Sequence, residues 1–252
     1  MFTPISYKAG AVWVANYVSF LAVFKLRSSN MEATRLESLA WGVVTAKILN
    51  RFKALFLHAM FNLFFTHIHE KVLLSTAEQE LVKKYFIPKK LRKKQYLLQE
   101  GDNCKYMVFV EKGLLRSYNV DEKGMEHMIQ FAWEGWWIAD TYSFLSGENA
   151  VYNIDAIEDA ELLMISLPNF EEMVLNVPKM ERYFRILFQN NIVSKERRLI
   201  SSNTYSAEEK YLELAETQPQ LIQRIPQNLV ASYLGITPET LSRIRKNIAI
   251  KK

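Results

Sequence analysis

The chain of 252 residues has a single cysteine, Cys104, and only eight glycines. One cysteine excludes an intramolecular disulfide and an iron–sulfur cluster held by several cysteines. The glycines never form a G-x-G-x-x-G phosphate loop. His67 and His69 are two residues apart and lack the i, i+4 spacing of a helical zinc pair. We therefore expect no catalytic site, no metal and no cofactor, and the low cysteine usage suits the cytoplasm.

The chain also lacks a long uncharged run. Residues 9–24 carry no charge, but this segment is shorter than the ~20 residues that cross a bilayer. Residues 43–65 are apolar and basic, as in an interfacial or partner-binding helix. We expect residues 1–60 to be an N-terminal extension, with residues 1–59 poorly ordered or not made. The alternative is a membrane-apposed or regulatory segment.

An excess of charge of one sign is found only at the end of the chain. The last 30 residues, 223–252, contain six basic residues and one acidic residue. The net charge of this segment equals the +5 of the whole chain, so the other 222 residues carry 26 basic and 26 acidic side chains. Basic excess in one short segment is the electrostatic pattern of nucleic-acid contact.

The same segment has the residue pattern of a helix-turn-helix. Pro226 can begin a helix, and Gly235 supplies its left-handed stop. Thr237 then caps a second helix with Pro238 at its first position. The apolar stripe of this second helix predicts its buried face: Leu241, Ile244 and Ile248.

The opposite face of the second helix carries donors and acceptors suited to base edges and phosphates in a major groove. The alternative is a helical hairpin that ends in a solvated basic tail, and the tight turn with one-sided basicity favours DNA. The predicted DNA-contacting residues are Gln227, Thr237, Glu239, Thr240, Ser242, Arg243, Arg245 and Lys246.

Short alternating runs separated by turn residues occupy the middle of the chain and predict an antiparallel barrel or jelly roll. The predicted strands are Gln95–Gln99, Tyr106–Glu111, Gly113–Val120, Glu126–Ala132, Tyr152–Ala156 and Ala160–Ser166.

A long helix is predicted after Pro178, and its apolar stripe suits a two-fold dimer seam. The predicted dimer residues are Met180, Phe184, Leu187 and Asn191. The alternative is packing of the stripe on the β-domain of the same chain, and both can hold on different faces. Residues 201–204 are a predicted hinge, and Ser206 with Glu209 predicts the next helix start through a capping box.

The segment 235–246, GITPETLSRIRK, resembles the recognition helix of the Crp/Fnr (cyclic-AMP receptor protein type) transcription regulators. By that resemblance Glu239 would accept a hydrogen bond from a cytosine amino group, and Arg243 would bind a guanine bidentately. The runs LQEGD (98–102), VFVEKGLLR (108–116) and AIEDAEL (156–162) resemble the family's cyclic-nucleotide-binding β-roll. The likeness covers about residues 75–250.

The resemblance implies an α+β fold with an antiparallel β-roll, a jelly roll like that of cyclic-nucleotide-binding domains. The other domains are a long dimerisation helix and a C-terminal helix-turn-helix domain. The expected boundaries are 1–60 for the extension, 61–177 for the roll, 178–203 for the dimer helix and hinge, and 204–252 for the DNA-binding domain.

In the family an Arg binds the cyclic phosphate, but residues 148–155 contain no basic residue. A buried phosphate without a cation is disfavoured, so we expect no response to cyclic AMP. Aromatic residues and a carboxylate near the family's ribose position could form a different ligand pocket or could pack the roll. The pocket residues proposed on this basis are Trp136, Trp137, Asp140 and Tyr142.

The sequence thus predicts a cytoplasmic, homodimeric regulator that binds an inverted repeat of double-stranded DNA. RNA polymerase is a candidate partner, and the effector is unassigned. The alternative is a ligand-sensing or membrane-apposed protein whose basic tail contacts anionic lipid.

Overall fold

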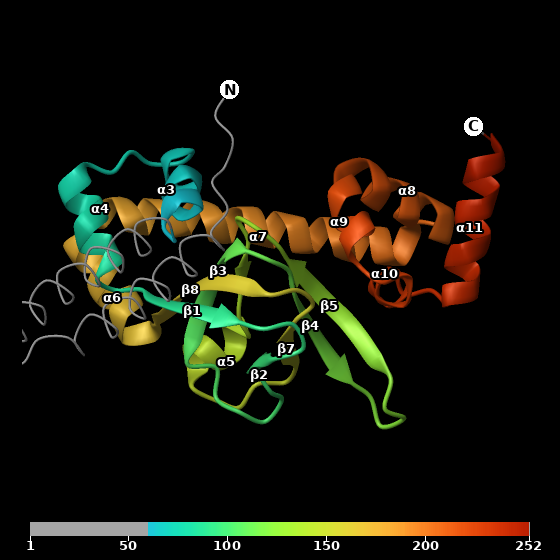
Figure 1. The fold of residues 1–252 in the computed structure, drawn as a ribbon, viewed down its shortest axis with the longest axis horizontal. Coiled ribbons are helices and arrows are strands. Elements are labelled where there is room, and N and C mark those ends of the chain that lie inside the picture. Colours follow the sequence, from blue (N-terminus) through green and yellow to red (C-terminus); the bar gives the residue numbers. More distant parts are fainter. Residues whose placement is uncertain (1–59, 252) are drawn as a thin grey trace, which may run out of the picture. The chain divides into compact units, whose positions relative to one another are not determined.

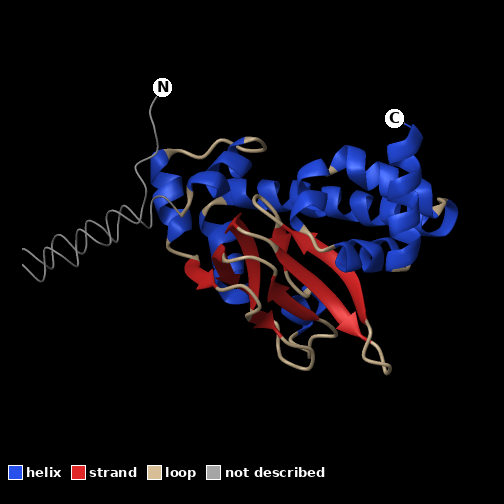
Figure 2. Ribbon diagram, turned by 45° about the vertical axis from the view of Figure 1, so that its right-hand side comes forward, coloured by secondary structure: helices blue, strands red, loops and turns tan. Residues whose placement is uncertain are grey.

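The computed structural model describes residues 60–251, so every expectation for residues 1–59 lies outside the described part of the chain. Within residues 60–251 no helix is both long and apolar enough to cross a membrane. The helices that precede and follow the β-strands are α3 (Asn62–His69), α4 (Thr76–Lys83), α6 (Leu167–Asn176), α7 (Pro178–Thr204), α8 (Ala207–Thr217), α9 (Pro219–Arg224), α10 (Gln227–Leu234) and α11 (Pro238–Lys251). Figures 1 and 2 show these elements.

Eight strands form two four-stranded antiparallel sheets around one core, which confirms the predicted jelly roll. One sheet has the order β1-β8-β3-β6 and the other β2-β7-β4-β5. A short helix, α5 (Thr141–Ser146), lies between β6 and β7. The strands are β1 (Ile87–Leu91), β2 (Tyr96–Leu98), β3 (Tyr106–Lys112), β4 (Leu115–Val120), β5 (Glu126–Ala132), β6 (Trp137–Ile138), β7 (Asn153–Ala156) and β8 (Ala160–Ser166).

All six predicted strands are present, and β5 and β8 have the predicted bounds. The strand β1 escaped prediction because its sequence, IPKKL, contains a proline and two lysines. It is an edge strand that pairs only with β8, and such strands tolerate proline and exposed lysine. The two-residue β6 is too short to give a periodic signal.

Local capping signals set the helix starts. Ser75 with Glu78 and Ser206 with Glu209 form reciprocal capping boxes at α4 and α8, and the second of them confirms the sequence prediction. Helix α9 was not predicted from the sequence. Pro219 opens α9, since the first position of a helix does not need the N–H that proline lacks.

Residues 201–204, the predicted hinge, form the last turn of α7, which continues without interruption to Thr204. The hydroxyl of Thr204 donates to the carbonyl of Ile200, and the N–H of Tyr205 donates to that of Ser201. These local bonds satisfy the last turn of the helix. The chain leaves the helix at Tyr205, which has extended backbone angles.

Gly113 fixes the approach of two turns of the roll. It has a φ of +100°, and a Cβ at this position would lie 2.5 Å from the carbonyl oxygen of Asp159. Only glycine fits both the left-handed backbone and this close approach. The β3–β4 turn is thereby held against the β7–β8 turn.

The start of α3 lies against a carboxylate of the roll. The side chain of Glu111 accepts hydrogen bonds from the N–H groups of Phe64, at 2.8 Å, and Leu63, at 3.3 Å. Burial raises the pKa of Glu111 to about 7, with a smaller contribution from the charge of Glu161, against the lowering effect of these two bonds. The helix start therefore depends on a carboxyl group that titrates near neutrality.

We expect Glu111→Gln to remove a pH dependence of stability. The folded pKa of Glu111 lies above its unfolded value, so between about pH 4.5 and 7 the native state holds more protons and stability falls as pH rises. After allowance for solvent screening, the variant should be more stable than the parent by about 1 kcal/mol at pH 8 and equal to it at pH 4. Urea unfolding across this range measures the difference. The exposed Glu122→Gln is the control, and parallel curves for both variants would contradict the prediction.

Candidate DNA-binding surface

The residues of the turn between α10 and α11 determine its conformation. Gly235 adopts the left-handed conformation, with φ of 69°, and its N–H donates to the carbonyl of Ser232. The N–H of Ile236 donates to the carbonyl of Ala231, which completes the helix stop. The hydroxyl of Thr237 accepts from the N–H of Thr240 and begins α11, as predicted.

One face of α11 is buried and fixes the helix. Leu241 is 1% exposed and Ile244 7%, whereas Ile248 is half-buried. Leu241 belongs to an apolar cluster with Leu229 and Val230 of α10. Burial of this stripe determines which residues of α11 face solvent.

The opposite face of α11 is open. Glu239, Ser242, Arg243 and Lys246 are exposed, and together with Pro238 they line one shallow surface hollow. Neither Arg243 nor Lys246 forms an ion pair with any described residue. The predicted contact residues thus meet on one free, polar and basic surface, which we name the α11 face.

The other predicted contact residues lie around the α11 face. Gln227 is exposed in the first turn of α10, and Thr237 is exposed at the cap of α11. Thr240 and Arg245 are half-buried, so they are less accessible than Arg243.

Glu239 lies at the N-terminus of α11. Its pKa is lowered, first by a hydrogen bond from its own N–H and then by the hydroxyl of Thr237. The side chain is therefore a carboxylate at neutral pH, an acceptor that matches the amino group of a cytosine.

Arg224 of α9 links the C-terminal helices, α8 to α11, to the β-roll. Its guanidinium lies 2.7 Å from a carboxylate oxygen of Glu134 and 2.7 Å from one of Glu158. These acidic residues belong to the β5–β6 and β7–β8 turns, and Glu134 also accepts from the N–H of Gly113. Two turns of the roll are thereby clamped to one side chain of the helical domain.

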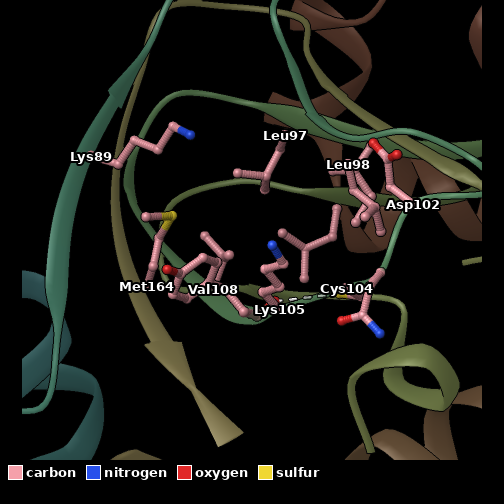
Figure 3. A pocket seen from close by; sticks show the side chains of 12 residues that line it. Lys89, Leu97, Leu98, Asp102, Cys104, Lys105, Val108 and Met164 are labelled. Carbon is pink, nitrogen blue, oxygen red and sulfur yellow. Dashed lines mark hydrogen bonds between the residues drawn. The ribbon is translucent and has the colours of Figure 1, made fainter. Parts of the chain in front are cut away.

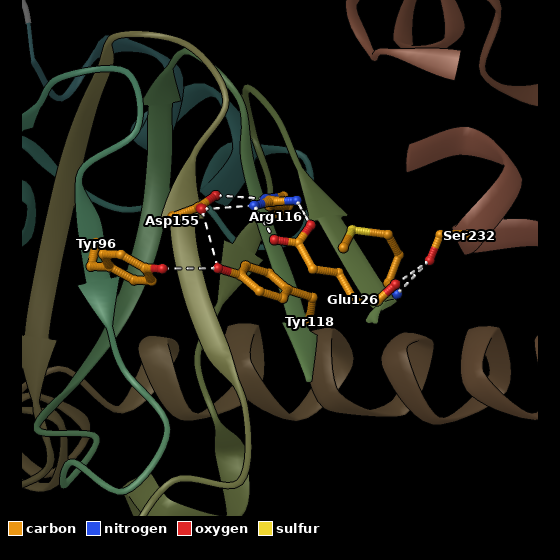
Figure 4. A network of polar contacts seen from close by, with 7 residues as sticks. Tyr96, Arg116, Tyr118, Glu126, Asp155 and Ser232 are labelled. Atoms are coloured by element: carbon orange, nitrogen blue, oxygen red, sulfur yellow. Dashed lines mark hydrogen bonds and ion pairs between the residues drawn. The ribbon is translucent and has the colours of Figure 1, made fainter. Parts of the chain in front are cut away.

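A second link runs through Ser232 of α10. Its hydroxyl donates to the carbonyl of Glu126 at 2.8 Å and accepts from the N–H of Met128 at 3.1 Å. The carboxylate of Glu126 in turn pairs with Arg116, which also binds Asp155 (Figure 4). This network joins three strands of one sheet to α10.

The guanidinium of Arg198, on α7, adds a third link. It lies 4.1 Å from the ring centre of Tyr233 and donates to the carbonyls of Ile129 and Met128. Arg198, Arg224 and Ser232 were not singled out by the sequence, because their hydrogen-bond partners lie 66–106 residues away along the chain.

The proposed ligand-pocket residues have structural partners. The Trp137 ring packs against Phe109 and Phe184, and its N–H donates to the hydroxyl of Tyr183. Asp140 is 1% exposed, caps α5 and accepts from the N–H groups of Ser143 and Val151. The ring of Trp136 packs at a tilt against that of Trp133, with centroids 4.1 Å apart, and Tyr142 is 58% exposed.

The apolar stripe of α7 divides in two. Met180 and Phe184 are buried in the core of the roll, and Leu187 is half-buried against it. From Phe188 onward the stripe is exposed, and Asn191 is exposed with it. We therefore expect a dimer seam only along the C-terminal half of α7.

Comparison with known proteins agrees with this architecture. The cyclic nucleotide-binding domain family matches residues 88–176, which comprise the strands of the roll and α6. Regulatory protein HlyX of Actinobacillus pleuropneumoniae is 26% identical over 176 residues, which cover 62% of this chain and 69% of HlyX. The matched domain and the regulators similar to this chain support the Crp/Fnr family of transcription regulators.

Two further likenesses agree with this assignment. The anaerobic regulatory protein of Aggregatibacter actinomycetemcomitans is 25% identical over 176 residues, 62% of this chain and 64% of the relative. The chain thus spans about two thirds of the length of these curated relatives. The structure of FixK2 from Bradyrhizobium japonicum matches with a TM-score of 0.56 and 18% identity, covering 66% of this chain and 85% of that one, and supports the fold.

The segment before β7 is held by hydrogen bonds from its own N–H groups, and residues 148–155 contain no basic residue. The N–H of Ala150 donates to the carbonyl of Asp102, and the N–H of Val151 donates to the Asp140 carboxylate. Arg116 lies beside β7 on the neighbouring strand β4, and its guanidinium already pairs with the carboxylates of Glu126 and Asp155.

Proposed function

We propose that this chain is a sequence-specific DNA-binding regulator that acts as a homodimer and does not require cyclic AMP. The α11 face is the observation that carries the proposal. Arg243 and Glu239 project from it as a guanidinium and a carboxylate in adjacent turns, which suits readout of neighbouring base pairs. The basic side chains around them suit phosphate contacts.

The dimer is supported by the free part of α7. Phe188, Ile192 and Leu199 are 38%, 59% and 63% exposed, and their spacing of four and seven residues puts them on one side of the helix. An apolar row of this kind is stabilised when a second helix covers it. A two-fold pair of chains would present two α11 helices to an inverted repeat.

Independence from cyclic AMP is supported by the charges of the roll. Residues 148–155 offer no cation to a phosphate, and Arg116 already holds two carboxylates. Desolvating a phosphate without a cation is unfavourable. RNA polymerase is a candidate partner in the cytoplasm, where chromosomal DNA is accessible.

Selection from random duplex DNA tests the proposal. We expect the full-length protein, without added nucleotide at near-physiological salt, to enrich an inverted repeat whose half-site centres lie about 34 Å apart. Cyclic AMP should leave the enriched sequence and its affinity unchanged. Enrichment of an unpaired half-site would refute the dimer, and absence of any enriched sequence, with and without cyclic AMP, would refute specific DNA binding.

A further inference from the structure

The roll contains a cavity away from the residues considered above. It has a volume of about 420 Å³ and opens between the two sheets. Residues of both sheets line it, so it lies within the roll rather than on its outer surface. Its size falls in the range of small-molecule sites, about 300–1,000 Å³.

The floor of the cavity is apolar. The side chains of Val108, Ile138 and Ile154 are at most 2% exposed, and Leu98 and Met164 are below a tenth. They come from five different strands that the roll holds in fixed register. Such a floor favours an apolar ligand body without rearrangement of the chain.

The mouth of the cavity is basic. Lys89 of β1 and Lys105, which precedes β3, both direct their ammonium groups into the space (Figure 3). Neither lysine forms an ion pair with a described residue. Asp102 is the carboxylate among the lining residues, so the lining carries a net charge of one positive unit.

We propose that this cavity binds a small carboxylic acid with an apolar body, whose carboxylate lies between Lys89 and Lys105 and whose body covers the apolar floor. Two converging ammonium groups suit an anion, because each forms a charge-assisted hydrogen bond to it. An alcohol would accept weaker hydrogen bonds because it carries no negative charge, and a protonated amine would be repelled. The inference is independent of the DNA-binding function, since neither lysine belongs to α11.

The only cysteine of the chain reports on occupancy. Cys104 lines the cavity and is 5% exposed, and burial raises the pKa of its thiol. It should therefore react slowly with iodoacetamide, and a ligand in the cavity should slow it further. Mass spectrometry of the native full-length protein measures this rate without any added label.

The first arm of the experiment compares decanoate, decan-1-ol and decylamine below their aggregation limits at pH 8. We expect saturable protection of Cys104 by decanoate at a concentration about tenfold lower than that needed with decanol, and least protection by decylamine. Equal protection by decanoate and decanol would overturn the proposal, and so would no protection by decanoate. This arm needs no variant, so it stands whether or not a substitution folds.

The second arm tests the lysines. Lys89→Gln/Lys105→Gln should raise the half-protecting concentration of decanoate about tenfold and leave that of decanol unchanged. Lys89→Arg/Lys105→Arg should retain decanoate binding. Lys123→Gln, an exposed lysine on the β4–β5 hairpin, is the matched control. A glutamine pair that binds decanoate like the parent would refute the assigned anion site.

Discussion

Replacing Arg243 by alanine should weaken binding to the selected DNA site by about 1–3 kcal/mol for each half-site and relax the preference at one base pair. Arg243 is exposed on the α11 face and has no ion-pair partner among the described residues, so its guanidinium is free to bind a guanine edge. The helix itself should survive, because Leu241 and Ile244 hold its buried face. Fluorescence anisotropy at fixed salt, with each base of one half-site varied in turn, measures both effects.

Two matched variants separate base reading from charge. Lys246→Ala removes a neighbouring cation of the same face. It should weaken binding to the selected site and to random DNA by the same factor and make both affinities less dependent on salt. Lys84→Ala removes an exposed lysine directly after α4 and should change neither the affinity for the selected site nor that for random DNA. If Arg243→Ala weakens all sequences equally, Arg243 is a phosphate contact and the base-reading role is wrong.

Replacing Arg116 by leucine should destabilise the roll by about 3 kcal/mol. The side chain of Arg116 is 13% exposed, that of Asp155 is 11%, and the two lie 2.8 Å apart. Burial alone would lower the pKa of Arg116, but its bonds to Asp155 and Glu126 outweigh burial and raise it. Without the guanidinium, the Asp155 carboxylate retains only a 3.5 Å contact with the hydroxyl of Tyr118. Urea unfolding gives the loss directly.

The control for Arg116 is an exposed pair in the other sheet. Lys90 and Glu161 lie 3.2 Å apart with side chains 60% and 32% exposed, so Lys90→Leu should cost less than about 1 kcal/mol. Adding Asp155→Asn to Arg116→Leu should recover part of the stability, because it removes the uncompensated charge. Equal losses for Arg116→Leu and Lys90→Leu would mean that water solvates Asp155 adequately.

Local chemistry explains which elements were predictable. Ser75 with Glu78 and Ser206 with Glu209 begin helices through bonds that span three residues, so four letters of sequence contain the signal. Gly235 ends α10 because few other residues adopt its backbone angles. The turn of the DNA-binding domain and the face that α11 exposes follow from such short-range rules.

The missed elements lacked a short-range signal. The sequence of β1 has the composition of a charged loop, and it forms a strand because it pairs with β8. Helix α9 is only six residues long. Residues 201–204 are rich in serine and threonine, which suggested a hinge. In the structure Ser201 and Thr204 instead make side-chain bonds that support the helix and its junction with α8.

The sequence by itself determined the strands of the jelly roll, the helix-turn-helix and the charged residues of the α11 face, because periodicity, caps and charge act over a few residues. Only the tertiary structure decided which half of the α7 stripe is free and which partners hold Arg116, Arg224 and Ser232. It also decided that Lys89 and Lys105 converge on one cavity. These arrangements depend on the register of strands and on contacts between residues far apart in the chain, and a local pattern does not encode them.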